Sequence, residues 1–197
     1  MAQFSWWKRT CAAILFVGLA IISPAQTLTT LANFNGTNGA NPQGGPLVQG
    51  TDGNFYGTTS SGGTMGKGTI FKITTAGTLT TLYSFSGGTD GGQPHAGLIQ
   101  ATDGNFYGTT LGGAEDAGTI FKITPGGTLT TLYSFSGKDG ATPDAGLAQG
   151  TDGNFYGTTL GGGNSSSGTV FKITPGGALT TLYSFTGGGT VKTLKLG

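Results

Sequence analysis

The sequence predicts an all-β protein of β-propeller type: three four-stranded antiparallel blades of about 50 residues, preceded by one extra N-terminal strand. The nine residues Thr-Asp-Gly-Asn-Phe-Tyr-Gly-Thr-Thr occur unchanged at 51–59, 102–110 and 151–159, so the chain is built from repeats. Glycine contributes 41 of 197 residues and charged residues only 9%, which favours strands joined by turns. No segment of the expected mature chain has the apolar spacing of an amphipathic helix.

The first 25 residues predict a secretory signal peptide, because two basic residues precede a short apolar run and a small-residue cleavage site. We expect cleavage between Ala25 and Gln26, which makes the protein secreted, periplasmic or exposed at the cell surface. The alternative is an uncleaved anchor. Cleavage would remove Cys11, the only cysteine, and we expect no membrane span in the mature chain.

The second unit shows how each blade is built. Its four predicted strands cover residues 96–101, 106–110, 118–124 and 128–135. Asp103-Gly104 predicts a tight turn between the first two strands, and Pro125-Gly126 predicts another between the last two. Looser segments make the other connections. Short connections favour antiparallel neighbours, so the unit is expected to be a meander.

Both faces of these predicted strands carry apolar residues. In the fourth strand, simple alternation places Thr131, Tyr133 and Phe135 on one face and Leu132 on the other. A sheet that is covered on both sides has this composition. Four-stranded units of this length that pack face to face are typical of propeller blades.

The predicted boundaries follow from the repeat. We expect a leading strand at 27–34, blades at 46–85, 96–135 and 145–185 within a repeat domain of 26–185, and a non-repeat tail at 186–197. Complete propellers have four to eight blades. The chain is therefore interpreted as a fragment of a longer array, with ring closure by oligomerisation and an open arc as alternatives.

Three motifs carry a family resemblance: Asp-Gly-Asn-Phe-Tyr-Gly-Thr-Thr, Gly-Thr-Ile-Phe-Lys-Ile-Thr and Leu-Thr-Thr-Leu-Tyr-Ser-Phe. Together they resemble the Gloeo/Verruco tandem repeat of secreted bacterial proteins, and the blades are similar to those of NHL-type propellers. The resemblance covers residues 27–185. It implies an exported or surface-displayed repeat protein, and it brings no catalytic residue to this chain.

Most residues that could carry chemistry have a structural interpretation. The Asp of each Asp-Gly-Asn, such as Asp103, is interpreted as a turn residue, because the loop lacks the spaced oxygen ligands of a calcium site. His95 is the only histidine and has no partner for a zinc site. Its counterparts by loop position are Gly45 and Asp144. We predict no catalytic residue, no metal site and no cofactor.

The variable parts of the repeat are the better candidates for binding. The tight turns hardly change between units, whereas the loose segments differ, and in a meander both loose segments emerge at the same rim. The candidate ligand-binding residues at this rim are Lys67, Asp90, His95, Glu115, Asp116, Asp139, Asp144 and Asn164.

The predicted function is a non-catalytic repeat module that binds a protein or a glycan through this rim. One alternative is a propeller enzyme of lyase or lactonase type, although such enzymes gather His, Glu or Asp side chains around a metal and this chain has one His and one Glu. Another is a structural spacer or assembly element that self-associates through exposed blade faces. The net charge of +1 without a basic patch excludes nucleic acid as an expected partner.

Overall fold

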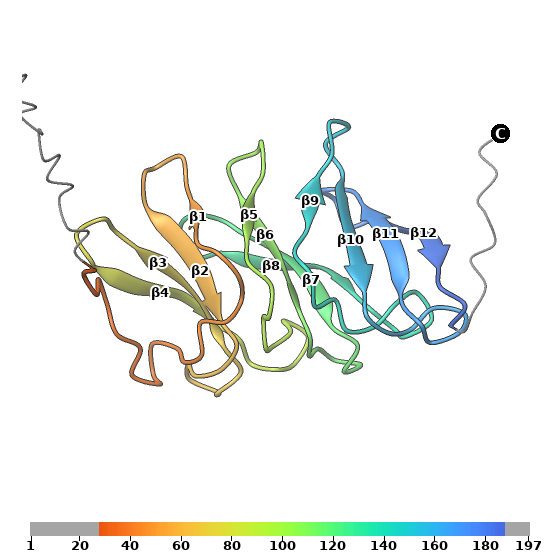
Figure 1. Cartoon of the computed structure of the whole chain (residues 1–197), viewed down its shortest axis with the longest axis horizontal. Helices are drawn as coiled ribbons and strands as arrows, with labels where there is room; N and C mark the ends of the chain where they lie inside the picture. Colours follow the sequence, from red (N-terminus) through yellow and green to blue (C-terminus); the bar gives the residue numbers. More distant parts are fainter. Residues whose placement is uncertain (1–27, 188–197) are drawn as a thin grey trace, which may run out of the picture.

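A computed structural model describes residues 28–187, so the predicted signal peptide and most of the predicted tail lie outside the described residues (Figure 1). The first sheet contains β1 (Val48–Gln49), β2 (Phe55–Thr59), β3 (Thr69–Ile73) and β4 (Leu79–Ser84). The second contains β5 (Ile99–Gln100), β6 (Phe106–Thr110), β7 (Thr119–Ile123) and β8 (Leu129–Ser134). The third contains β9 (Ala148–Gln149), β10 (Phe155–Thr159), β11 (Thr169–Ile173) and β12 (Leu179–Ser184). Across this range no helix could cross a membrane.

Each sheet is an antiparallel meander whose strand order follows the chain, as predicted. The protein is therefore all-β and propeller-like, with three blades side by side (Figure 1). The predicted strand 106–110 coincides with β6, whereas the predicted strand 96–101 shrinks to Ile99–Gln100. The reason is that residues before Ile99 pack against the preceding blade: a methyl group on Gly97 would lie 2.9 Å from the carbonyl oxygen of Gly44.

A β-bulge corrects the predicted faces of the fourth strand. Ile120 pairs with Tyr133, but the next residue, Phe121, pairs with Thr131, so Leu132 is an extra residue in β8. Tyr133 therefore lies on the same face as Ile120, and the prediction that it shares a face with Thr131 was wrong. Because the bulge interrupts the alternation, Leu132 and Tyr133 both pack against the core toward the third blade.

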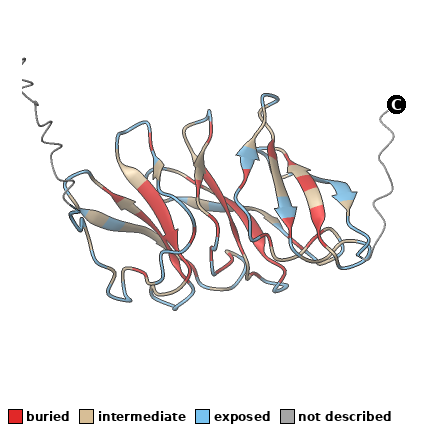
Figure 2. Cartoon of the chain, in the orientation of Figure 1, coloured by how far each residue is buried: buried red, intermediate tan, exposed pale blue. Residues whose placement is uncertain are grey.

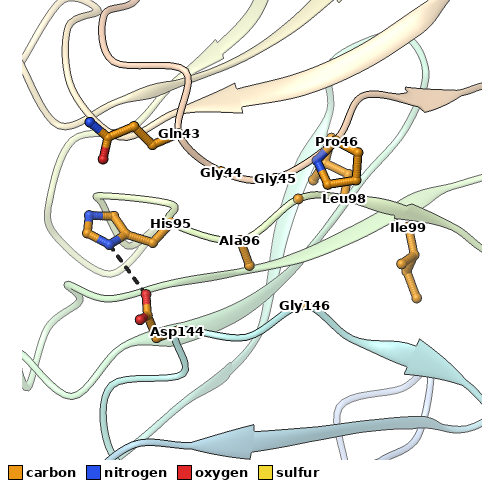
Figure 3. Close-up of a pocket in the computed structure, with 11 residues that line it drawn as sticks. Gln43, Gly44, Gly45, Pro46, His95, Ala96, Leu98, Ile99, Asp144 and Gly146 are labelled. Carbon is orange, nitrogen blue, oxygen red and sulfur yellow. Dashed lines mark ion pairs between the residues drawn. The ribbon is translucent and has the colours of Figure 1, made fainter.

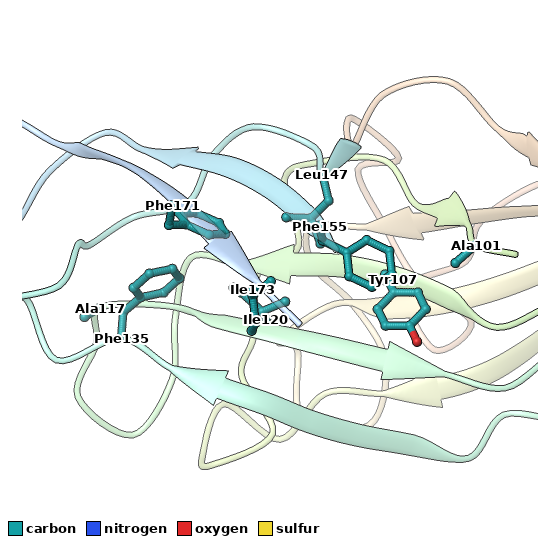
Figure 4. Close-up of a cluster of buried hydrophobic side chains, with 9 residues drawn as sticks. All are labelled: Ala101, Tyr107, Ala117, Ile120, Phe135, Leu147, Phe155, Phe171 and Ile173. Atoms are coloured by element: carbon teal, nitrogen blue, oxygen red, sulfur yellow. The ribbon is translucent and has the colours of Figure 1, made fainter. Parts of the chain in front are cut away.

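Most residues of the inner strands, such as β6 and β7, are buried (Figure 2). Buried aromatic side chains join neighbouring blades (Figure 4). Phe155 stacks on Tyr107 with ring centroids 4.1 Å apart, and Phe171 meets Phe135 edge-on at 5.3 Å. The first and second blades make the same two aromatic contacts through the equivalent residues of their own repeats. We call the face with Tyr107 and Phe135 the forward face of its blade, and the face with Phe155 and Phe171 the back face of its blade. Each interface joins one forward face to one back face.

The predicted leading strand is not a strand: the described part, residues 28–34, forms no β-ladder. These residues, which we call the N-terminal segment, nevertheless lie where the fourth strand of a preceding blade would lie. Phe34 meets Phe71 edge-on at 5.0 Å, as Phe85 meets Phe121 at 5.4 Å. A β-ladder needs a neighbouring strand, and none of the described strands pairs with this segment.

Candidate functional site

The variable loose segments lie together at one rim of the molecule, as predicted. Isolated β-bridges join the two loose segments of each blade, between Ala40 and Ser61 in the first blade and between Ala141 and Gly161 in the third. We call this the loop rim. The tight turns, which are nearly identical between the blades, connect the opposite ends of the strands (Figure 1).

A cavity of about 430 Å³ opens where the loops that precede β1, β5 and β9 come together (Figure 3). Pro46, Leu98 and Ile99 provide its apolar lining, and glycine backbone provides much of the rest. Its polar side chains are those of Gln43, His95 and Asp144.

Those three polar side chains occupy the same position in three successive blades. In each loop a residue with positive φ is followed by a proline, and the proline is followed by the pocket residue. The positive-φ residues are Asn41 (54°), Gln93 (55°) and Thr142 (57°). Their carbonyl oxygens accept equivalent backbone hydrogen bonds from Ser60, Leu111 and Leu160. The repeat therefore presents one variable side chain per blade to a common pocket.

This equivalence corrects the predicted counterpart of His95 in the first blade, which is Gln43 and not Gly45. The first blade has one more residue between its proline and the following Leu47 than the second blade has before Leu98. The prediction took the residue just before each predicted blade (46–85, 96–135 and 145–185), and in the first blade this residue is Gly45. The shared proline, followed by the variable residue, was the signal in the sequence that could have identified Gln43.

His95 and Asp144 form the one polar contact seen between these pocket side chains. Nδ1 of His95 lies 3.3 Å from Oδ1 of Asp144, and the two side chains are 40% and 53% exposed. Gln43 is also exposed and lies beside His95 (Figure 3). An amide, an imidazole and a carboxylate together offer both donors and acceptors to a ligand.

Two of the predicted rim candidates, Asp90 and Asp139, stabilise the loops that contain them. Asp90 accepts hydrogen bonds from the backbone N–H of Ser86 at 2.7 Å and the hydroxyl of Tyr83 at 3.1 Å. Partial burial raises the pKa of Asp90, but hydrogen bonds from the hydroxyl and backbone N–H of Ser86 and from Tyr83 outweigh it, so the pKa is lowered. Asp139 accepts equivalent bonds from Ser136 and Tyr133. Both carboxylates are thus engaged in closing turns.

The other four candidates are exposed on the loop rim outside the pocket lining: Lys67, Glu115, Asp116 and Asn164. The stem of Lys67 lies along Gly87, where an added methyl group would be 3.0 Å from the lysine chain. Asp116 adopts a positive φ of 49° in a turn. Of the predicted candidates, the structure brings together only His95 and Asp144 in the pocket.

The residues of the Asp-Gly-Asn-Phe-Tyr motif hydrogen-bond to one another, which confirms the interpretation of its aspartate as a turn residue. Oδ1 of Asp103 accepts the backbone N–H of Asn105 at 3.0 Å, and Oδ2 accepts the hydroxyl of Tyr107 at 2.8 Å. The bond from the tyrosine was not predicted. Equivalent bonds occur in the other two blades, so this motif is identical between blades because it builds the blade.

Replacing Tyr107 with phenylalanine is expected to cost about 1 kcal/mol at pH 7 and less at pH 3. Partial burial raises the pKa of Asp103, but the hydrogen bonds from Asn105 and Tyr107 outweigh it and lower the pKa. A carboxyl group whose pKa is lowered by folding stabilises the protein above its unfolded pKa of about 3.9, and this contribution is lost as the pH falls through the folded pKa. Urea unfolding at both pH values measures the difference.

The equivalent change in the third blade, Tyr156→Phe, is the matched control. Tyr156 is more exposed than Tyr107, so its hydrogen bond to Asp152 is expected to contribute less. An energy difference between wild type and Tyr107→Phe that is the same at pH 7 and pH 3 would contradict the proposed link to Asp103.

Within residues 28–187 no three His, Cys, Asp or Glu side chains gather as a metal site would require. Among solved structures, an X-ray structure of a presumed gluconolactonase is similar, with a TM-score of 0.45 and 16% identity. The similarity covers 68% of this chain and 45% of that one, so the chain spans less than half of that protein.

The comparison with curated proteins found no match. The model of the Gloeobacter/Verrucomicrobia repeat matches residues 19–195, which is most of the chain. The strand pattern, the buried motif residues and this match agree with the resemblance seen in the three repeated motifs. The chain therefore belongs to the Gloeobacter/Verrucomicrobia repeat family.

Proposed function

We propose that this protein is a non-catalytic binding module that holds a glycan in the pocket formed by Gln43, His95 and Asp144. One observation carries the proposal: three consecutive blades with nearly identical strands and tight turns place three different polar side chains at the same position around one cavity. A position that serves only to build the blade has no reason to differ in this way, as the unchanged Asp-Gly-Asn turns illustrate.

The chemistry of the lining favours a neutral, hydroxyl-rich ligand. Gln43 and His95 can each donate and accept hydrogen bonds, and Asp144 accepts them, which suits hydroxyl groups that do both. Pro46 and Leu98 supply apolar surface for the C–H groups of a sugar ring. A single carboxylate beside a single imidazole offers little to a highly charged ligand.

We further propose that the protein acts outside the cytoplasm, as a secreted or surface-displayed module. The charge and apolar pattern of the first 25 residues supports this. Sequencing the amino terminus of the protein recovered from its native host tests the idea, since export predicts a mature chain that starts at Gln26.

Glycan-array screening followed by titration of the best ligand tests the binding proposal. Asp144→Ala and Gln43→Ala are each expected to weaken binding by roughly 3- to 30-fold, because each removes a hydrogen bond and tenfold in affinity corresponds to about 1.4 kcal/mol. Glu115→Ala and Asn164→Ala are the controls: both residues are exposed on the same rim but outside the pocket.

Binding that is unchanged by the pocket substitutions, or a screen in which no glycan binds, would overturn the proposal.

A second candidate function rests on the contact between His95 and Asp144, because a carboxylate that orients an imidazole is also the arrangement of a general base. The glycans that bind, and the corresponding sugar lactones, are therefore also assayed for hydrolysis. Turnover that His95→Ala abolishes would favour the enzyme of lactonase type.

A further inference from the structure

The forward face of the third blade is exposed, although it is built like the two forward faces that are buried. Phe185 is 43% exposed, whereas Phe85 and Phe135 at the same position are both 0% exposed. Tyr183 and Leu182 beside it are 48% and 49% exposed. Three large apolar side chains exposed together at one end of the described chain are typical of an interaction surface.

We propose that this face binds the back face of the first blade of a second copy of the chain, head to tail. The argument is continuity with an interface that the chain already forms twice. Its two halves recur at the two ends of the described chain: a forward face on the third blade and a back face on the first. A second copy is therefore the partner whose shape and chemistry the exposed face fits.

The aromatic contacts identify matching unfilled positions at the two ends. Tyr56 stacks on Phe106 at 4.0 Å, and Tyr107 stacks on Phe155 at 4.1 Å. The series leaves Phe55 on the first blade and Tyr156 on the third, and neither has a ring partner within residues 28–187. Docking a second copy would stack Tyr156 of one copy on Phe55 of the other.

Polar contacts between blades follow the same series. The side-chain oxygen of Gln100 accepts the backbone N–H of Thr51 at 2.9 Å, and that of Gln149 accepts Thr102 at 3.1 Å. The matching pair at the ends is Gln49 on the first blade and Thr151 on the third. Between copies, the Gln49 side chain would reach the backbone of Thr151. The interface would thus satisfy the polar groups that flank its apolar centre.

Threonine side chains extend this polar match. The hydroxyl of Thr58 donates to the carbonyl of Ala96 in the next blade, and both side chains are buried. Thr158, at the same position in the third blade, is exposed. Its partner between copies would be the carbonyl of Gly45, which stands two residues before Leu47 as Ala96 stands two residues before Leu98.

The N-terminal segment competes with this docking. The backbone of Leu31 packs against Gly77 in the same way as the backbone of Leu132 packs against Gly177. A methyl group added to Gly77 or to Gly177 would lie 2.5 or 2.6 Å, respectively, from the leucine carbonyl oxygen. Phe34 takes the position that Phe185 of the second copy needs. Association therefore requires residues 28–34 to leave the back face of the first blade. The free energy needed to displace them weakens the association of the two copies.

A head-to-tail interface produces either a closed ring or an open chain of copies. Two copies would supply six blades, within the range of four to eight that closed propellers use. A dimer and a longer assembly are both results of the same contact, and a mass measurement distinguishes them.

The test is the mass of the mature chain in solution, measured by sedimentation from about 1 to 200 µM. We expect a mass that rises with concentration, to two chains or more. Phe34→Ala is expected to shift association to at least about tenfold lower concentration, by weakening the competing segment. Phe185→Asp should abolish association, because it places a charge at the centre of the contact. Met65→Asp, which changes an exposed loop residue, should have no effect.

A cross-linking experiment keeps the proposal testable if Phe185→Asp unfolds the blade. The mature chain has no cysteine, so Gln49→Cys and Thr151→Cys introduce single thiols at exposed positions. A short bismaleimide should join a mixture of the two variants into mixed dimers, while Met65→Cys mixed with Thr151→Cys should not react in this way. A single-chain mass for both wild type and Phe34→Ala at every concentration, without specific mixed dimers, would overturn the proposal.

Discussion

Phe135→Ala is expected to lower the free energy of unfolding by about 3–5 kcal/mol, the loss that a large aromatic side chain causes when it is removed from a core. Phe135 is fully buried. Its ring meets Tyr133 edge-on at 5.4 Å within its own blade and Phe171 at 5.3 Å in the next. The change therefore leaves a cavity at the junction of two blades, and neither sheet can fill this cavity by itself.

Phe185→Ala is the matched control, because the repeat places the same residue in the same local structure without a following blade in the described chain. With 43% of its surface exposed and only Tyr183 as an aromatic neighbour among the described rings, it should cost less than half as much. Urea unfolding followed by circular dichroism, at concentrations too low for association, measures both. Equal losses at the two positions would contradict the assignment of stability to the interface between blades.

The second large effect is expected at Gly118, where alanine should cost about 2–5 kcal/mol. Gly118 has φ of +95°, a conformation that costs an L-residue about 1–2 kcal/mol. The added methyl group would also lie 2.5 Å from the carbonyl oxygen of Thr110 and 2.4 Å from a ring carbon of Pro143. One of these obstacles is backbone and the other is a rigid ring, so overpacking adds about 1–3 kcal/mol.

Two further glycines separate the contributions to this loss. Gly104 has φ of +79° but no atom within 4 Å of an added methyl group, so Gly104→Ala should show the conformational cost alone. At Gly126 the nearest atom would lie 3.8 Å away and φ is not in the positive region, so Gly126→Ala should be close to neutral. A loss at Gly118 no larger than at Gly104 would show that the contact with Pro143 relaxes freely.

The strands that were predicted best depend on local chemistry. Residues 106–110 follow an Asp-Gly turn and have strong β-propensity, so their neighbours in sequence specify the strand. The predictions that failed depend on distant residues. The bulge at Leu132 allows two adjacent side chains to pack toward the next blade, and the N-terminal segment is not a strand because no described strand pairs with it. Neither condition is visible within a short window of sequence.

The candidate site was predicted in part for the same reason. His95 and Asp144 were recognised as variable rim residues, but their meeting at 3.3 Å depends on how the second and third blades stack. Gln43 was missed because the loops were aligned on the starts of the predicted blades and not on the proline that precedes the pocket residue. In the sequence Asp90 was a variable rim residue and a binding candidate, as His95 was, but hydrogen bonds from Tyr83 and Ser86 make Asp90 part of a turn.

By itself the sequence determined that this protein is a β-repeat of three blades, with repeated, nearly identical turns and variable loops on opposite rims. Those properties follow from a period of two in the strands and from turn residues a few positions apart. Only the tertiary structure decided which loop residues share a pocket and which blade faces stay exposed. Both depend on contacts between residues about 50 positions apart, such as Tyr107 with Phe155, and stacking of whole blades sets those distances.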